Sequence, residues 1–516
     1  MAATKEAVIA TPTDCKITPF YKGANILITG GTGFVGLALV EKLLRTLDVG
    51  AIYLLVRSKK GVNIEDRVKE LSLNQLFSDL SDEFIKKVRP IHGDVSKVDL
   101  EISTEDKLFL EKNVNIVFHL AASLDFGESL KNNMNTNLLG TRRVLQLCKG
   151  MSNLKAVVHV SSAYVNSNLR EASEMVYPAP DDVGNIVEAI EGRTNEELER
   201  DEKLILKDYP NGYTLTKFFA EHEVANCEEL KSKSAIVRPS MITSAWKEPA
   251  PGWTISKNGP TGFFMGAAKG VVRRLPVNKH AVYDYVPVDV VVNTMLVSAC
   301  YVSSKSASEV PVFHCTSSKS NPFRWIDIDD QINVFLHRYP LNGAVWYPYL
   351  KLLSNMTHFK ISAFFVHFIP AYILDFIIKL SGGRPRLVRL HTSIGKSLTL
   401  LKPFIFLEWT FHNDNTQMLH KCLSEDERET FGVDFSTLKW REYFDDVTQG
   451  VRRYLHKEEP RTLEAARRKD FVLFVLHVLL MLFMFGGIWF AGTLFFGTTA
   501  LSLVIPLIAY MLFSIL

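Results

Sequence analysis

A tyrosine and a lysine four residues apart are the first candidates for chemistry in this sequence. The stretch PNGYTLTKFFAEHEV, residues 210–224, places Tyr213 and Lys217 in what its pattern predicts to be the first turns of a helix. Four residues are about one helical turn, so both side chains leave the same face. A cation near a phenol favours the phenolate, which makes proton transfer easier near neutral pH. The pair therefore indicates a proton donor, although such a pair alone is more often an ordinary surface contact.

A glycine-rich loop near the start of the chain predicts a dinucleotide site. The segment NILITGGTGFVGLALVEKLL carries Gly30, Gly33 and Gly36 in TGxxGxxG spacing, between a predicted strand and a predicted helix. Glycine permits the tight turn, the close approach of backbone to a pyrophosphate and the close packing of helix on strand. The strand and helix context favours dinucleotide binding over a simple turn. The residues that we expect to line the cofactor here are Thr29, Gly30, Gly33, Phe34, Val35 and Gly36.

The ends of the next predicted strands indicate which dinucleotide binds. NAD-specific folds usually place a carboxylate after the second strand, for the ribose 2′-hydroxyl, whereas this chain has Arg57, Lys59 and Lys60, which suit a 2′-phosphate. The alternative is a solvated basic loop. HGDV puts Asp94 where the adenine amino group would be met, and HLAAS ends a strand beside the cofactor. We therefore expect NADP(H), with further contacts from Arg57, Lys59, Asp94, Val95 and Ala121.

The elements that must position these residues alternate over residues 25–160. Short runs rich in Val, Ile and Leu lack strict polar alternation, as buried parallel strands do. Helical stretches such as GLALVEKLLRTL lie between them. This order predicts an α/β fold with a doubly wound parallel sheet of the Rossmann type. The predicted strands are NILIT, AIYLLV, RPIHGDV, VNIVFHLAA and AVVHVSS.

Length and composition allow more than this one domain. The 516 residues suffice for two or three domains, and beyond residue 345 the strand alternation stops in favour of helical patterns. Residues 178–208 turn polar and charged and predict a helical excursion. We expect an N-terminal tail over 1–20, a reductase-type Rossmann domain over 21–344, a smaller helical domain over 345–465 and a hydrophobic tail over 471–516.

The hydrophobic tail predicts a membrane anchor. Residues 471–516 contain no Asp, Glu, Lys or Arg, and the stretch FVLFVLHVLLMLFMFGGIWFAGTLFF exceeds the roughly 20 residues that span a bilayer. A buried helix pair is the less favoured alternative. RRKD, residues 467–470, precedes the tail, so the positive-inside rule places the main body in the cytosol. One span and a hairpin are both open, as are the endoplasmic reticulum and the peroxisome.

Charge and cysteine content limit the remaining functions. The formal net charge is +3 with 22% charged residues, which gives no reason to expect a nucleic acid partner. The six cysteines form no CxxC pair and no zinc-ligand spacing, so we expect free thiols in a reducing compartment and no metal site. The first residues, MAATKEAVIATPTDCK, lack the apolar core of a secretory signal.

A pair of serines later proves relevant to the tyrosine and lysine, because the three residue types together suggest an active site. HVSSAYVNS ends a predicted strand with Ser161 and Ser162. With Tyr213, Lys217 and the glycine loop, this resembles the extended short-chain dehydrogenase/reductase superfamily. The resemblance implies that serine and tyrosine hydrogen-bond a substrate carbonyl, while lysine lowers the phenol pKa and binds the nicotinamide ribose. Alignment of SSAYV favours Ser162 over Ser161, although a slip of one residue leaves the choice open.

Further motifs narrow the resemblance to alcohol-forming fatty acyl-CoA reductases. The motifs are EPAPGWTISKNGPTGFFMGAAKGVVR, DYVPVDVVVN, TSSKSNPFRW and WTFHNDNTQML, and the likeness covers nearly the whole chain. It implies that long-chain acyl-CoA and two NADPH give a fatty alcohol and CoA, through a hemithioacetal and an aldehyde. Such alcohols supply wax ester or ether lipid synthesis. The catalytic residues implied are Ser162, Tyr213 and Lys217.

Several alternatives remain at this level. A membrane-bound sterol dehydrogenase would share the serine, tyrosine, lysine and anchor, and a silent NADPH-binding scaffold would share the fold. The apolar helix expected over 361–380 is read as a core helix, with an acyl tunnel wall or a membrane contact as alternatives. FHNDNT, residues 411–416, is read as a helix cap rather than a catalytic group.

Overall fold

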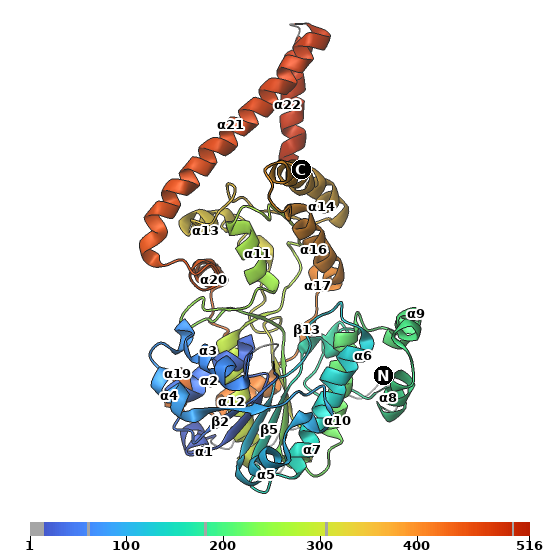
Figure 1. Ribbon diagram of the computed structural model, residues 1–516, viewed down its shortest axis with the longest axis vertical. Coiled ribbons are helices and arrows are strands. Elements are labelled where there is room, and N and C mark those ends of the chain that lie inside the picture. Colours follow the sequence, from blue (N-terminus) through green and yellow to red (C-terminus); the bar gives the residue numbers. More distant parts are fainter. Residues whose placement is uncertain (1–14, 59–61, 180–182, 305–307, 498–499, 516) are drawn as a thin grey trace. The chain divides into compact units, whose positions relative to one another are not determined.

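The computed structural model describes residues 15–58, 62–179, 183–304, 308–497 and 500–515 (Figure 1). Contacts divide the chain into two compact units. Unit 1 comprises the described residues of Met1–Pro251, Val282–Phe323 and Glu408–Leu438. Unit 2 comprises those of Gly252–Ala281, Arg324–Leu407 and Lys439–Leu516.

These units interleave along the chain, so they differ from the continuous ranges expected from the sequence. The stretches 252–281 and 324–344 group with the C-terminal helices, whereas 408–438 return to the sheet-containing unit. The predicted tail over 1–20 also differs in its last residues. Cys15 and Ile17 are buried, and the Ile17 N–H donates to the Glu427 carboxylate at 2.7 Å.

Unit 1 is built on a seven-stranded parallel sheet with the order β11-β7-β5-β4-β1-β2-β3. The chain passes from β1 outward to β3 and then crosses back to β4, which is the doubly wound order, so the predicted fold is confirmed. Each predicted apolar run contains one of its strands. The bounds are β1 Ile26–Thr29, β2 Ile52–Val56, β3 Val88–His92, β4 Ile116–His119, β5 Ala156–Val160, β7 Ser234–Pro239 and β11 Val312–Cys315.

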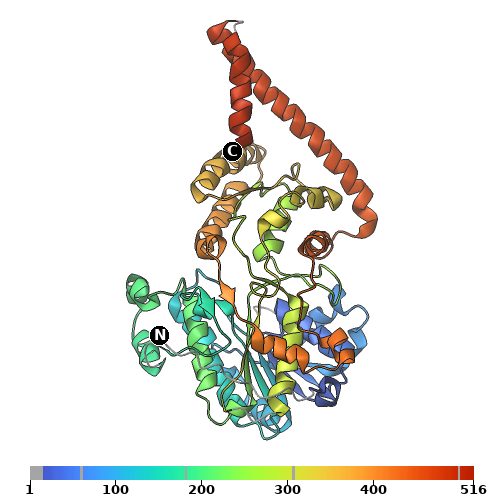
Figure 2. The ribbon, with the colours of Figure 1, turned by 180° about the vertical axis from the view of Figure 1, so that it is seen from behind.

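Burial explains why these runs lack polar alternation. Every residue of β1, β2, β4, β5, β7 and β11 is buried, because helices cover both faces of the sheet. Only the edge strand β3 has exposed and half-buried positions. Figure 2 shows α12 (Val288–Ser304), with α18 (Asp414–Lys421) and α19 (Glu425–Phe431), on one face. The direction of the chain reverses between β1 and β4, which is where such sheets bind ligands, at their carboxyl ends.

The other helices of unit 1 follow the predicted order. The excursion over 178–208 forms two helices, and a π turn at Met134–Leu138 joins α6 to α7. Two short parallel pairs, β8 (Met241–Thr243) with β10 (Tyr285–Pro287) and β6 (Glu171–Ala172) with β13 (Thr410–Phe411), complete the unit. The helices are α1 Ile17–Tyr21, α2 Phe34–Thr46, α3 Ile64–Ser72, α4 Ser81–Lys87, α5 Thr104–Asn113, α6 Leu130–Asn133, α7 Leu139–Lys149, α8 Val183–Glu191, α9 Asn195–Leu206 and α10 Gly212–Ala225.

The cap predicted in FHNDNT has the right position, but the side chain that accepts the hydrogen bonds is a different one. Helix α18 does begin after Asn413, but the Asn413 side chain does not cap it. Instead Glu174, far away in sequence, accepts from the Thr416 N–H at 3.2 Å and the Thr416 hydroxyl at 2.8 Å. A remote carboxylate satisfies the helix terminus better than a local amide, and only the fold brings it there.

Unit 2 is mostly helical, with one short parallel pair, β9 (Arg274–Pro276) with β12 (Lys351–Leu353). The helix expected over 361–380 is longer and is interrupted by a π turn at Phe364–Phe368, just before Pro370. Pro370 has no N–H to continue the helical ladder, which accounts for a break at this point. The helices are α11 Gly259–Ala268, α13 Ile332–Arg338, α14 Met356–Ala363, α15 Ile369–Leu380, α16 Leu387–Leu400, α17 Lys402–Phe406, α20 Trp440–Gly450, α21 Leu463–Phe496 and α22 Ala500–Ile515.

Two helical stretches in unit 2 are long and apolar enough to cross a membrane, by length and composition. They are Met356–Leu380 and Pro460–Phe495. The second contains α21 of the predicted tail, and α22 lies against it, with the Phe485 and Tyr510 rings 5.6 Å apart. The first is the helix read as a core helix, and that interpretation is wrong, because most of its apolar residues are exposed. Helical periodicity shows that a helix has an apolar face, but not what covers that face.

Candidate active site

Helix α10 presents the predicted tyrosine and lysine on one buried face. It begins at Gly212, so Tyr213 and Lys217 lie in its first turns as predicted, and Asn211 caps it by accepting from the Thr214 N–H at 3.0 Å. Tyr213, Lys217 and Glu221 then follow at intervals of four residues, and all three side chains are buried. The pair is therefore not a surface contact, since three polar groups in the interior require a structural or chemical reason.

The structure brings Ser162 to Tyr213. Ser162 lies two residues after the end of β5 and accepts from the Tyr164 N–H at 3.2 Å, which fixes its side chain near the carboxyl end of the strand. Burial raises the pKa of Tyr213 to about 12, against a side-chain hydrogen bond with Ser162 that lowers it. The neighbouring Ser161 hydroxyl is buried with no hydrogen-bond partner among the described residues. Ser162 rather than Ser161 therefore belongs to the same site as the phenol.

Lys217 lies in this site but does not acidify the tyrosine. Its ammonium donates to the Val160 carbonyl at 2.7 Å, at the end of β5. Burial lowers the pKa of Lys217 to about 8, although Glu221 opposes the change. The expectation that the lysine holds the phenol pKa below its usual value is not met in this structure, because desolvation dominates both groups. The phenol is protonated at neutral pH, which suits a proton donor.

A buried ion pair behind the lysine holds α10 against the sheet, and sequence reasoning missed it. Glu221 accepts from Arg238 of β7 in a bidentate pair, at 2.8 Å from Nε and 2.6 Å from Nη2. Both side chains are at most 1% exposed. Arg238 also donates to the Met175 and Ser173 carbonyls at 2.9 and 3.3 Å and to His314 Nε2 at 3.1 Å, so all five of its N–H groups are used. The sequence signal for this ion pair was Arg238 itself, a charged residue in the middle of the apolar run SAIVRPSMI.

Two histidines lie within the sheet below this site and were also missed. His119 of β4 and His159 of β5 are register partners, with ring centroids 5.2 Å apart. Burial, together with the charge of Lys217, lowers the pKa of His119 to about 3, so the ring is neutral. His119 pairs with Thr29 at 2.7 Å and with Thr141 at 3.0 Å, which links β1 and α7 to the strand beneath the lysine. The sequence signal for this pair was a histidine in each of two successive apolar runs, VNIVFHLAA and AVVHVSS.

The glycine loop has the geometry that a dinucleotide requires. Gly30 has a φ of +74°, and a Cβ there would lie 2.8 Å from the Ala121 backbone nitrogen. A Cβ at Gly36 would lie 2.4 Å from the Gly30 carbonyl oxygen, so the loop, β4 and α2 pack too closely for any side chain. Gly33 stands at the start of α2 with no side chain to cap it, as pyrophosphate binding at a helix N-terminus needs. These residues fit the predicted cofactor.

The other predicted cofactor residues lie at the carboxyl ends of the strands, with different side-chain roles. Thr29 is buried, and its hydroxyl accepts from the Ala121 N–H at 3.2 Å. Arg57 is exposed directly after β2. Asp94 accepts from the Ser96 N–H at 2.9 Å and thereby shapes the loop after β3. Val95 is buried in that loop, Phe34 and Val35 open α2, and Lys59 lies outside the described residues.

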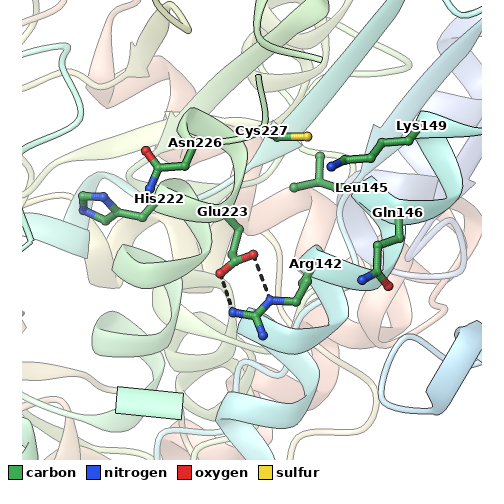
Figure 3. A pocket seen from close by; sticks show the side chains of 8 residues that line it. All are labelled: Arg142, Leu145, Gln146, Lys149, His222, Glu223, Asn226 and Cys227. Carbon is green, nitrogen blue, oxygen red and sulfur yellow. Dashed lines mark hydrogen bonds and ion pairs between the residues drawn. The ribbon is translucent and has the colours of Figure 1, made fainter. Parts of the chain in front are cut away.

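A groove elsewhere on α10 is distinct from this site. It lies at the C-terminal end of the helix, on the far side of Glu221 from Tyr213, and Figure 3 shows its lining side chains. Arg142 of α7 donates to the Glu223 carboxylate at 3.0 and 2.8 Å, which joins the two helices across the groove. The groove therefore serves helix packing. Its residues are Arg142, Leu145, Gln146, Lys149, His222, Glu223, Asn226 and Cys227.

Comparison with known proteins identifies relatives of the whole chain. Two family models, both described as male sterility protein, match residues 28–295 and 366–458. A Drosophila melanogaster relative is 49% identical over 508 residues, which are 96% of this chain and 98% of that protein. Fatty acyl-CoA reductase 1 of Rattus norvegicus is 37% identical and that of Homo sapiens 36%, each covering 88% of both chains.

Solved structures show the same fold at low sequence identity. The reductase domain of a nonribosomal peptide synthetase from Mycobacterium tuberculosis matches with a TM-score of 0.54 and 17% identity, over 85% of this chain and 92% of that one. The terminal R domain of the myxalamid PKS-NRPS pathway matches with a TM-score of 0.51 and 16% identity, over 84% and 91%.

Proposed function

The chain belongs to the fatty acyl-CoA reductase family, and we propose that it converts long-chain acyl-CoA to fatty alcohol and CoA with two NADPH. It is an oxidoreductase of fatty acyl groups that uses a nicotinamide cofactor. The observation that carries the finer proposal is the convergence of Ser162, Tyr213 and Lys217 at the end of β5. Family membership argues against a sterol dehydrogenase, and the assembled triad argues against a silent scaffold.

The catalytic residues act on the substrate carbonyl oxygen. Ser162 and Tyr213 are hydrogen-bonded neighbours, and each carries one O–H that would donate to the thioester carbonyl oxygen and polarise it. The nicotinamide cofactor, when bound, supplies hydride. The addition product is a hemithioacetal, whose carbon–sulfur bond breaks to release CoA thiolate and the aldehyde.

The second reduction uses the same groups, with Tyr213 as the proton donor to the aldehyde oxygen. An alkoxide is a stronger base than a phenolate, so a phenol with a pKa of about 12 still transfers its proton downhill. The Ser162 hydroxyl then stabilises the phenolate that remains. Lys217 is placed to hold the nicotinamide ribose, since its ammonium lies buried at the end of β5.

The preference for NADPH rests on charge after β2. Arg57 is exposed at that strand end, where a 2′-phosphate of the adenosine ribose would lie, and no carboxylate precedes it in the strand. Lys59 and Lys60 follow in the sequence and add positive charge to the same loop. We propose Arg57 as the principal contact.

The tail anchors the enzyme in the membrane of the endoplasmic reticulum or the peroxisome, with the catalytic units facing the cytosol. The support is the apolar α21, the cationic RRKD stretch before it, and the contact between α21 and α22, which suits a hairpin. Fatty alcohol made there supplies wax ester or ether lipid synthesis.

The test is product identification with the purified full-length protein. Acyl-CoAs of several chain lengths are incubated with NADPH or NADH, and alcohol, aldehyde and free CoA are quantified. We expect alcohol and CoA in equal amounts, with NADPH consumed at twice that amount. Accumulation of aldehyde alone, or equal use of NADH, would contradict the proposal.

A further inference from the structure

Helix α15 in unit 2 carries its apolar residues on the outside. The residues Ile369, Tyr372, Ile373, Phe376, Ile377 and Leu380, which we call the apolar strip, recur at intervals of three and four, so they share one face. Leu380 is 72% exposed, Phe376 63% and Tyr372 58%. The preceding π turn extends the strip with Phe364 and Phe365, which are about half exposed. This is the reverse of the pattern in a soluble helix.

Polar contacts hold the opposite face and fix this orientation. His367 accepts from the backbone N–H groups of Arg273 and Arg274 at 2.9 and 3.2 Å, and Ser362 accepts from the Arg274 guanidinium at 3.1 Å. Asp375 accepts from three backbone N–H groups at the start of α16, at 2.9–3.0 Å. The helix cannot rotate its strip inward, or leave the unit to cross a bilayer, without losing these hydrogen bonds.

Exposed positive charge begins at the end of the strip and continues over the residues that follow it. Residues 356–407 contain seven Lys and Arg and a single acidic residue, Asp375, which is engaged as the cap of α16. The six cations between residues 379 and 402 are all exposed, and no Asp or Glu among the described residues forms an ion pair with them. They are Lys379, Arg384, Arg386, Arg389, Lys396 and Lys402. Apolar side chains beside such cations match the headgroup and acyl layers of an anionic bilayer.

We propose that the apolar strip lies in the interfacial layer of an anionic lipid bilayer, with α15 parallel to the membrane plane, as a contact separate from the tail. A bilayer suits the strip better than a protein partner, because the surrounding charge is of one sign and the strip is aliphatic and aromatic throughout. The tail belongs to the same unit, so an anchored tail keeps this face near the lipid. The inference does not depend on the proposed reaction.

The experiment measures the depth of single labels on the full-length protein in vesicles. All six native cysteines are buried, so cysteines introduced at exposed positions are the preferred sites for a fluorescent NBD label, with the wild type as background. The labelled variants are Ile369→Cys, Phe376→Cys and Leu380→Cys. Leu108→Cys, on α5 of unit 1, is the control, since it is equally apolar and 62% exposed. Vesicles contain phosphatidylcholine and phosphatidylserine, with bromine at shallow or deep acyl positions.

We expect NBD at all three strip positions to shift to the blue and to be quenched by shallow bromine, while the label at 108 changes little. Residues 369 and 380 are eleven apart, which is roughly 16 Å along a helix. A helix in the membrane plane gives both the same depth, whereas a crossing helix gives depths that differ by about that distance. A crossing result, or absence of quenching at the strip, would overturn the proposal.

Two further experiments test whether anionic lipid, and not a second copy of this chain, covers the strip. Replacing phosphatidylserine by phosphatidylcholine, or making the triple variant Arg384→Ala, Arg386→Ala and Arg389→Ala, should reduce quenching at 376 by at least half while the tail stays inserted. If a second copy of this chain covered the strip, the blue shift would depend on protein concentration and bromine would not quench the label. That result would refute lipid as the molecule that covers the strip. Thermal unfolding of each variant shows that the fold is retained.

Discussion

Helices α10 and α15 invert the usual rule for side-chain burial in opposite directions. Helix α10 buries a phenol, an ammonium and a carboxylate at Tyr213, Lys217 and Glu221, whereas α15 exposes aromatic and aliphatic residues such as Phe376. Buried polar groups cost free energy unless they are paired, and exposed apolar patches cost free energy unless something covers them. We propose that each helix marks a place where the chain meets another molecule, a substrate at α10 and lipid at α15.

The two helices also differ in how their orientation is secured. On α10 the polar residues themselves make the contacts, through the Arg238 pair and the Val160 carbonyl. On α15 the contacts come from the few polar residues among apolar ones, His367 before the helix and Asp375 within it. Substitutions in the exposed strip should consequently spare the fold, while substitutions that break the buried Glu221–Arg238 pair of α10 should not.

The largest effect is expected at the phenol. Tyr213→Phe keeps the ring and removes its only proton, so turnover should fall about 10²- to 10⁴-fold, as for loss of a general acid. Thioester and aldehyde reduction are measured separately, with cofactor affinity by fluorescence.

Two serine variants supply the control for the phenol. Ser162→Ala should reduce turnover, whereas Ser161→Ala, at an equally buried hydroxyl without a partner, should leave it nearly unchanged. If Ser161→Ala is the damaging change, Ser161 and not Ser162 is the catalytic serine.

Next in size is the ion pair behind the lysine. Arg238→Met leaves Glu221 buried without its partner, which should destabilise unit 1 by about 3–5 kcal/mol. Arg142→Met breaks a bidentate pair of similar geometry between α7 and α10, but its side chains are partly exposed, so about 1 kcal/mol or less is expected. Chemical denaturation followed by fluorescence compares them, and equal losses would remove the distinction between buried and exposed pairs.

A pH effect should reveal the charge of Lys217. With a pKa of about 8, the lysine is charged below that pH and neutral above it. If the ammonium binds the ribose, NADPH affinity should fall about tenfold between pH 7 and pH 9, because the charged fraction falls by that factor. Titration of cofactor fluorescence across this range provides the measurement. Lys217→Arg stays charged and should show no such dependence, and a wild type without it would exclude the ribose contact.

A smaller effect is expected from an exposed cation at the other end of the cofactor. Arg57→Ala removes one charge-assisted contact in a solvated position, so the KM for NADPH should rise about tenfold. The KM for NADH should stay nearly constant, since it lacks the 2′-phosphate. An equal rise for both cofactors would assign Arg57 to the fold of the loop instead.

The smallest effect is expected on the strip of α15. Phe376→Ser in detergent should change the unfolding free energy by no more than about 0.5 kcal/mol, as for other exposed positions. The buried Phe118 of β4 is the matched control, and Phe118→Ser should cost several kcal/mol. A large loss from Phe376→Ser would mean that the strip packs against the protein.

The sequence by itself determined the sheet, the cofactor loop and the reactive pair. Apolar runs without alternation must be buried on both faces, and glycine at positions 30 and 36 is required wherever the backbone approaches so closely. Tyr213 and Lys217 share a face because helical geometry is local and independent of what surrounds it. These properties follow from the nearest neighbours in the chain.

Only the tertiary structure decided what surrounds each of those elements. It brings Ser162 into a hydrogen bond with Tyr213 and Arg238 into an ion pair with Glu221. It also brings Glu174 to the start of α18 and leaves the strip of α15 exposed. It also set the phenol pKa above its usual value, because burial is a property of the whole fold and outweighs the hydrogen bond with Ser162. Contacts between residues tens or hundreds of positions apart, and the desolvation that they produce, cannot be read from local spacing.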